Sequence, residues 1–311
     1  MASLGTRRAA PLETASHRLL PDGRRMHLHH GPIDLIVTAE GAPEAVRAAY
    51  GRAVARFETV LTELVAELPV LRSPVPTEGT LPLTGAIARR MAAAAWPYRP
   101  GFVTPMAAVA GAVAEAVLEA IIAAPGLTRA AVNNGGDIAL WLAPGAAPWR
   151  IGLVVDPADP ASPGAVAIPP DSPVRGVATS GRHGRSLTLG LADSVTVLAP
   201  TAAAADVAAT LIANAVDCPG HPAVTRVPAC TLHPDSDLGD RLVTVEVGPL
   251  SPDDVAAALD AGATFASECI DRGLVHGAVL VLHDRVRVVG ALEGARAPSS
   301  IPDLREVPLH V

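Results

Sequence analysis

The chain has 311 residues and a formal net charge of −7, and only 3% of its residues are aromatic although 50% are hydrophobic. An acidic chain with no long basic run and few aromatic rings lacks the charged and stacking surfaces that nucleic acids require, so we expect no nucleic-acid partner. The three cysteines, Cys218, Cys230 and Cys269, have no CxxC spacing, which favours a reducing compartment and hence a cytoplasmic location.

The N-terminal sequence and the apolar segments predict neither export nor a membrane span. Arg7 and Arg8 are not followed by an apolar stretch, so no signal peptide is expected. The longest apolar stretches are shorter than a bilayer span or contain Pro and Glu. We expect a flexible N-terminal arm over residues 1–25, followed by a domain over residues 26–311 that is built as one body or as two coupled lobes.

The first half of the chain shows helical periodicity in two places, where apolar residues recur three or four positions apart. The expected elements are a strand at 33–37, a long helix at 44–68, a linker with four prolines at 69–82 and an Ala-rich helix at 105–124. Gly111 lies inside the second helix, where Gly costs roughly 1 kcal/mol relative to Ala. We therefore expect another backbone to approach Gly111 closely.

The second half of the chain is predicted to contain many short strands and two more helices. Strands are expected on both sides of a Gly-rich turn within 130–142 and at 151–155, 174–179, 186–191, 194–198, 242–247, 274–282 and 286–289, helices at 201–215 and 252–272, and a loop at 218–240. Ser251 is a plausible N-cap for the last helix. Because helices and strands mix without strict alternation, the sequence favours an α+β fold over a doubly wound sheet.

The first segment with chemical potential is Asn133-Asn134-Gly135-Gly136-Asp137. Two glycines permit positive φ and remove side chains from one face, so a ligand phosphate or ring can reach backbone N–H groups. Asp137 can accept a hydrogen bond from a ligand hydroxyl. An ordinary Asn-Gly hairpin turn explains the same spacing.

The second segment runs from Ala178 to Ser186 and brings together hydroxyls, glycines and two arginines at the end of a strand. Such a turn can hold a phosphate through backbone donors and an arginine fork. It lacks the spacing of a P-loop. A solvated polar hairpin is the alternative interpretation.

The third segment is the strand after Asp193 together with Asp206 and Thr210 on the following helix. Asp206 and Thr210 are four residues apart and so lie on the same helical face. A carboxylate and a hydroxyl are hard oxygen ligands that suit Mg²⁺ or Ca²⁺. The alternative is an exposed Asp and a Thr bonded to its own helix, although a carboxylate in an otherwise apolar helix requires a partner.

In this order, GGD at 135–137, TSG at 179–181, SVTV at 194–197 and A-D-x-x-A-T at 205–210 resemble the ApbE-like proteins, whose founding members are FAD:protein FMN transferases. The resemblance implies an α+β, T-fold-like architecture of mixed sheets with packed helices. It also implies Mg²⁺ and FAD as cofactors, a flavin or nucleotide as ligand and an acceptor protein as partner, and it leaves a homo-oligomer open.

Carried onto this chain, the resemblance assigns the flavin nucleotide site to the two glycine turns, that is to Asn134, Gly135, Gly136, Thr179, Ser180 and Gly181. It assigns Mg²⁺ to Asp206 and Thr210. We expect Asp137 and His183 to be the catalytic side chains, because the pKa range of histidine suits proton transfer near neutral pH.

Two family segments are missing. The His-His-x-x-Asp-Pro-x-Thr-Gly stretch of the transferases has no counterpart in the short interval 182–193, and the equivalent of their Gly-x-x-Lys-Gly stretch, at 108–112, contains no Lys. The chain is therefore similar to a separate branch. Its function is flavin-site transferase chemistry, or alternatively flavin binding or assembly without catalysis, or catalysis on an unrelated small molecule.

Other metal sites are less favoured by the sequence. His27, His29 and His30 are expected to form a solvated surface run without a nearby acidic partner. The spacing of Cys218 and Cys230, with histidines between and after them, fits no standard zinc finger.

Overall fold

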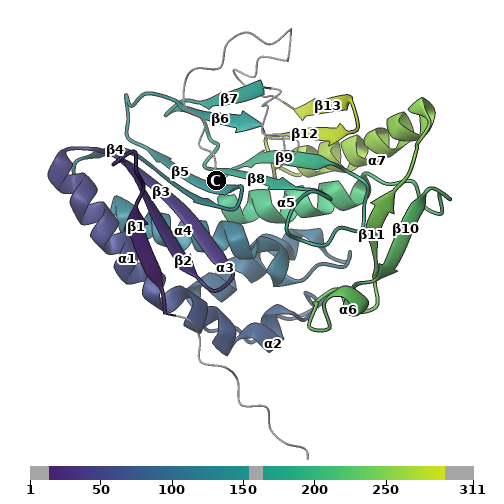
Figure 1. The fold of residues 1–311 in the computed structure, drawn as a ribbon, viewed down its shortest axis with the longest axis horizontal. Helices are drawn as coiled ribbons and strands as arrows, with labels where there is room; N and C mark the ends of the chain where they lie inside the picture. Colours follow the sequence, from purple (N-terminus) through teal and green to yellow (C-terminus); the bar gives the residue numbers. More distant parts are fainter. Residues whose placement is uncertain (1–13, 154–163, 291–311) are drawn as a thin grey trace, which may run out of the picture.

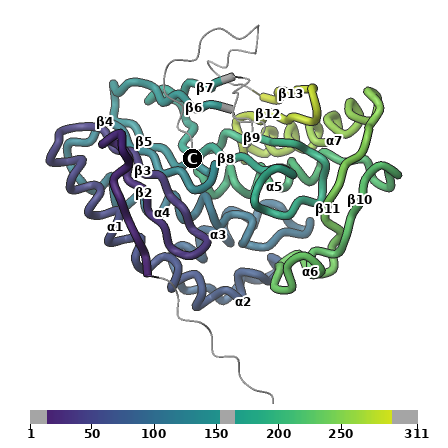
Figure 2. Tube along the Cα trace, in the orientation of Figure 1, coloured from purple at the N-terminus to yellow at the C-terminus, as the bar shows by residue number. Residues whose placement is uncertain are grey.

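The computed structural model describes residues 14–153 and 164–290, and its central element is a nine-stranded sheet (Figure 1). Neighbouring strands are antiparallel throughout and follow the order β1-β2-β3-β4-β5-β8-β9-β12-β13. Their bounds are β1 Ser16–Leu19, β2 Arg25–His30, β3 Ile33–Gly41, β4 Leu127–Asn134, β5 Asp137–Leu142, β8 Gly176–Ser180, β9 Ser194–Ala199, β12 Gly277–Leu282 and β13 Arg285–Gly290. Figure 2 shows the colours passing in chain order from the purple edge of the sheet to the yellow one.

Four long helices cover one face of this sheet in the same order as the strands they contact. They are α1 Pro43–Ala66, α4 Val109–Ile122, α5 Ala202–Ala215 and α7 Pro252–Asp271. α1 packs on β3, α4 on β4 and β5, α5 on β8 and β9, and α7 on β12 and β13. The shorter elements on this side are α2 Leu68–Leu71, α3 Ala86–Ala95, η1 Trp96–Tyr98 and η2 Pro105–Ala108. The α+β class expected from the sequence is therefore confirmed.

Alanine makes up most of the buried residues of α5 and several of those of α4, which lets these two helices approach closely. A Cβ at Gly111 would overlap the backbone carbonyl of Ala202 at the start of α5. The close backbone approach predicted for Gly111 is thus confirmed. By length and composition the segment Pro105–Ile122 could cross a membrane, with a mean hydropathy of 1.7, but 56% of it is buried in this fold, and a core helix meets the same test.

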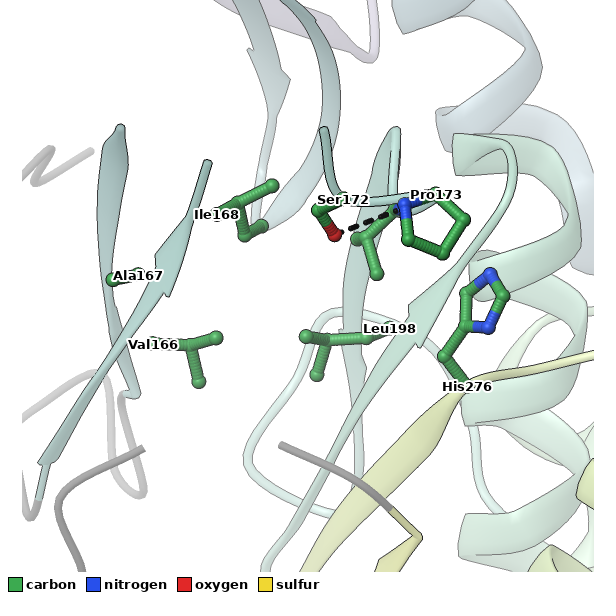
Figure 3. Close-up of a pocket in the computed structure, with 8 residues that line it drawn as sticks. Val166, Ala167, Ile168, Ser172, Pro173, Leu198 and His276 are labelled. Atoms are coloured by element: carbon green, nitrogen blue, oxygen red, sulfur yellow. Dashed lines mark hydrogen bonds between the residues drawn. The ribbon is translucent and has the colours of Figure 1, made fainter. Parts of the chain in front are cut away.

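The opposite face of the sheet carries a separate two-stranded sheet, β6 Trp149–Leu153 and β7 Gly164–Ile168. Its apolar side chains form a second, smaller core with residues of β5, β8 and β9. Between this hairpin and the main sheet lies a cavity of about 160 Å³, with Leu198 and His276 opposite Val166 and Ile168 (Figure 3). This cavity is lined by none of the predicted site residues.

Four expectations about local structure are wrong. The first residues of the linker expected at 69–82 belong to the short helix α2. Ser16–Leu19, expected in a loose arm, form the edge strand β1 paired with β2, while residues 1–13 lie outside the described part. The segment 218–240 is not simply a loop, because it contains β10 Val224–Pro228, which pairs with β11 Leu242–Val247, and the short helix α6 Ala229–Leu232. The segment 186–191 is not a strand.

The physical reason for the last error is long-range. The Leu189 N–H donates to the Asn214 side-chain oxygen at 2.9 Å, and the Leu191 N–H donates to the Val216 carbonyl at 2.7 Å. The N–H groups of Leu189 and Leu191 are thus satisfied by the end of α5, while the Thr188 carbonyl accepts a single backbone hydrogen bond from Thr244 of β11 at 2.9 Å. The partners of this segment are divided between a helix end and a strand, so no regular strand pairing forms. Helix α3 is not predicted because its run of alanines obscures the helical spacing of Ile87 and Met91, which are both buried.

Candidate functional site

The first glycine corner is the tight turn between β4 and β5. Gly135 and Gly136 both have positive φ, +64° and +112°. The Asn133 side-chain oxygen accepts the Gly136 N–H at 2.8 Å, and the Asn134 side-chain nitrogen donates to the Ala110 carbonyl at 3.1 Å. The hairpin is therefore closed by one amide side chain and attached to the start of α4 by the next one.

Two carboxyl groups from distant parts of the chain influence each other beside this corner. Asp137 opens β5, and Asp206 lies one turn into α5, where its Oδ2 accepts the Gly111 N–H at 2.9 Å. Burial raises the pKa of Asp206 to about 7, against the N–H groups of Gly111 and Ala110, which lower it. Burial and then the charge of Asp206 raise the pKa of Asp137 well above its usual value.

Asp137, next to the first corner, is also influenced by groups of the second corner. The Thr179 N–H and the positive charge of Arg185, both from the second glycine turn, lower the pKa of Asp137 and so oppose its rise. Asp137 and Asp206 each keep part of their surface exposed, although their surroundings desolvate the carboxyl groups. Two desolvated carboxyl groups that repel each other favour a proton or a cation beside them.

The second glycine corner follows β8. Gly181 has φ +151°, and a Cβ there would overlap the carbonyl of Asp193. The Thr179 hydroxyl is 2.9 Å from the Thr196 hydroxyl, so Thr179 offers its backbone rather than its side chain to the carboxylate pair. Ser180, the last residue of β8, is partly exposed.

A buried carboxylate that the sequence did not mark as an anchor fixes this second corner. Asp193 is 6% exposed; its Oδ1 accepts from Arg182 Nε at 2.5 Å, and its Oδ2 accepts the His283 N–H at 2.5 Å. His183 Nε2 lies 3.4 Å from the same Oδ1. The only sequence signal for this role is an acid directly before an apolar strand.

The structure thus brings together Gly135, Asp137, Asp206 and the backbone of Thr179. It pairs His183 with Asp193 instead of either member of the carboxylate pair. Thr210 is partly exposed one turn beyond Asp206 on α5. The catalytic, cofactor-binding and metal-binding roles of these residues stay predictions.

The donor set at the pair fits a hard divalent cation. Two carboxylates that repel each other, with a hydroxyl one helical turn away, supply the oxygen ligands that Mg²⁺ prefers, and Mg²⁺ commonly completes its shell with water and phosphate oxygens. Within residues 14–153 and 164–290, no group of three or more His, Cys, Asp or Glu side chains is arranged to hold a metal ion.

The histidine run on β2 does have an acidic partner, contrary to our expectation. Asp34 on β3 is 3.0 Å from His27 Nε2 and 3.2 Å from His29 Nδ1. Antiparallel pairing of β2 with β3 places His29 opposite Asp34, which the sequence distance does not show. His30 faces the other way and packs edge-on against Phe57.

The fold and the two glycine corners around a carboxylate pair define an α+β protein of the ApbE-like class. The sequence model of the family described as "AbpE bacteria" matches residues 17–288, and the chain belongs to this family.

Curated relatives cover only part of the chain. A UPF0280 protein of Methanospirillum hungatei is 37% identical over 142 residues, which are 45% of this chain and 55% of the relative. A UPF0280 protein of Methanopyrus kandleri is 36% identical over 182 residues, 58% of this chain and 69% of the relative. The chain spans about half the length of the first of these relatives.

Two solved structures are similar in outline. The ApbE protein of Thermotoga maritima has a TM-score of 0.49 at 12% identity and covers 88% of this chain and 96% of its own. The flavin transferase ApbE of Vibrio cholerae has a TM-score of 0.46 at 13% identity and covers 91% and 99%. At these TM-scores the class assignment rests on the family match and on the topology above.

Proposed function

We propose that this chain binds FAD or a related nucleotide diphosphate in a Mg²⁺-dependent manner and transfers FMN from FAD to an acceptor protein. The observation that carries the proposal is the meeting of Asp137 and Asp206 beside both glycine corners. Membership in the AbpE family and the name of the Vibrio cholerae flavin transferase support the choice of ligand and reaction.

The metal-binding role in this proposal falls to Asp206 and Thr210. The Gly111 N–H fixes one oxygen of Asp206 and so orients its carboxylate. When bound there, Mg²⁺ would neutralise the pyrophosphate and polarise the phosphorus that is attacked. Asp137, Gly135 and Gly136 would line the ligand on one side and the Thr179–Gly181 turn on the other.

Proton transfer is assigned to His183. Its Nε2 is 3.4 Å from Asp193 Oδ1, so this carboxylate can orient the imidazole ring. In the transfer, the acceptor hydroxyl oxygen bonds to the FMN phosphorus, the bond from that phosphorus to the AMP oxygen breaks, and His183 takes the hydroxyl proton. AMP leaves with the electron pair of the broken bond.

A second candidate is a flavin-binding or assembly protein without catalysis. It is favoured by the short interval 182–193, which lacks the histidine pair of the transferases, and by the absence of Lys from the Ala108–Ala112 segment. Incubation with FAD and an acceptor protein, followed by mass spectrometry, separates the two. An FMN adduct on the acceptor excludes the second candidate, and bound but unreacted FAD excludes the first.

The binding step is tested by calorimetry with FAD in the presence and absence of Mg²⁺. We expect Mg²⁺-dependent binding that Asp206→Ala abolishes, because the variant removes the carboxylate that holds the cation. Asp271→Ala is the matched control, since Asp271 is an exposed carboxylate at the end of α7. Absence of binding by any flavin nucleotide would contradict the proposal.

A further inference from the structure

Two arginines only three residues apart in the second corner have different surroundings. Arg182 is committed to the buried Asp193 through an ion pair of 2.5 Å. Arg185 is exposed and makes no hydrogen bond or ion pair with the residues that the structure describes. The Arg182 guanidinium therefore stabilises the turn, and the Arg185 guanidinium presents its N–H donors to solvent.

The position of Arg185 is nevertheless defined by the first corner. A Cβ on Gly135 would overlap Arg185 Nη2 and would lie 3.2 Å from its Cζ, so the guanidinium lies directly against the Gly135 backbone. Gly135, with φ +64°, has no side chain to occupy that space. The second corner thus places its arginine over the first one.

Arg185 also lies near the carboxylate pair without neutralising it. Its charge lowers the pKa of Asp137, yet no Arg185 nitrogen is within 4.0 Å of a carboxylate oxygen of the described residues. A cation held by the carboxylates and a guanidinium with unused donors would then face the same space. That combination is complementary to a phosphate group bound to a metal ion.

We propose that Arg185 binds a phosphate of the ligand and sets the preference of this site for phosphorylated ligands. The inference rests on the proposed function. Planar guanidinium recognises phosphate oxygens in a bidentate manner, whereas lysine provides only a point charge. Arg185 lies within the interval where this chain departs from the transferase pattern, so it supplies a phosphate contact that is this chain's own.

The alternative is an exposed arginine that is merely solvated, and it predicts that the residue can be replaced without effect. Calorimetry of the full chain with Mg²⁺ distinguishes the two, with FAD, riboflavin and inorganic pyrophosphate as probes. Riboflavin carries the same ring without phosphate, so it reports on the rest of the site. Arg52→Ala is the matched control, because it removes the same charge from an exposed position on α1.

We expect Arg185→Ala to weaken FAD and pyrophosphate binding about tenfold or more, since charge-assisted hydrogen bonds to the phosphate are lost. Riboflavin affinity stays unchanged, and Arg185→Lys recovers only part of the FAD affinity. Arg52→Ala binds all three as the wild type does.

A failure of the Arg185 proposal can be distinguished from a failure of the proposed function. If the wild type binds FAD with Mg²⁺ and Arg185→Ala binds it equally well, the role of Arg185 is overturned and the proposed function stands. If the wild type binds no flavin nucleotide, the proposed function fails, and pyrophosphate decides on Arg185. Loss of pyrophosphate binding in Arg185→Ala then supports its phosphate role, and equal or absent binding overturns it.

Discussion

The two glycine corners that meet at the carboxylate pair are held in place by different means. The first corner is closed by its own neighbours, because Asn133 accepts the Gly136 N–H and Asn134 reaches the Ala110 carbonyl. The second corner is held by Asp193, which binds Arg182 of the corner and the His283 N–H of the β12–β13 turn. One corner is thus locally determined, whereas the other depends on residues up to 90 positions apart.

The two corners therefore also differ in which side chains hold the turn and which remain able to contact a ligand. In the first corner both asparagine side chains are used in holding the turn, so only backbone groups and Asp137 remain for a ligand. In the second corner Arg182 and His183 are attached to Asp193, and that attachment leaves Arg185 directed at the first corner. The fixed residues of one turn therefore position the exposed one.

The largest effect is expected from glycine replacement in the second corner. Gly181→Ala places a Cβ over the Asp193 carbonyl and 2.8 Å from its carbon, at φ +151°. Because backbone cannot move aside as a side chain can, we expect a loss of about 3 kcal/mol or more in the free energy of unfolding. Urea denaturation measures it.

Gly136→Ala is the matched variant in the first corner. Gly136 has φ +112°, but no atom lies within 4 Å of the position that a Cβ would take, so only the backbone conformation opposes the change. We expect a loss of about 1–2 kcal/mol. Equal losses for the two variants would show that the corners are not held differently.

Much of the first corner was predictable from the sequence, because its determinants are adjacent. The Asn-Asn-Gly-Gly-Asp run specifies a hairpin, and both glycines have the positive φ that such a turn requires. The close approach at Gly111 was predictable for a similar reason, since a glycine inside a helix signals a neighbouring backbone.

The second corner was only half predictable. Its strand β8 is expected from the sequence, but the segment after it has the pattern of another strand, whereas its backbone bonds to the end of α5. The role of Asp193 depends on β9 and the β12–β13 turn lying side by side, which no local pattern encodes. The same limit applies to Asp34, whose histidine partners are brought near only by strand pairing.

The carboxylate pair between the corners should make the stability of the fold depend on pH. The pKa of Asp206 is about 7 in the folded chain against an ordinary value of 3.8, so the folded state binds more protons than the unfolded state between these values. Stability therefore falls as the pH rises from about 4 to about 7 and levels off above that. We expect a difference on the order of 2 kcal/mol, reduced by partial exposure.

Melting curves between pH 5 and pH 8 measure this dependence, and Asp206→Asn is the control because it keeps the size of the side chain and an oxygen for the Gly111 N–H. The variant should have a flatter profile than the wild type. Added Mg²⁺ should stabilise the wild type more at pH 8 than at pH 5. Parallel profiles of wild type and variant would contradict the raised pKa that burial gives to Asp206.

The smallest expected effect is local to the first corner. Asn133→Ala removes the acceptor of the Gly136 N–H and should lower the free energy of unfolding by about 1 kcal/mol, the usual contribution of one hydrogen bond. Hydrogen exchange should accelerate at the Gly136 amide and stay unchanged at the His283 amide, which Asp193 holds in the second corner. Arg182→Ala should reverse that pattern, since it disturbs the anchor of the second corner and leaves Asn133 in place. If either variant changes exchange at both amides alike, the corners form one cooperative unit, and the separate anchoring of Arg185 over Gly135 loses its basis.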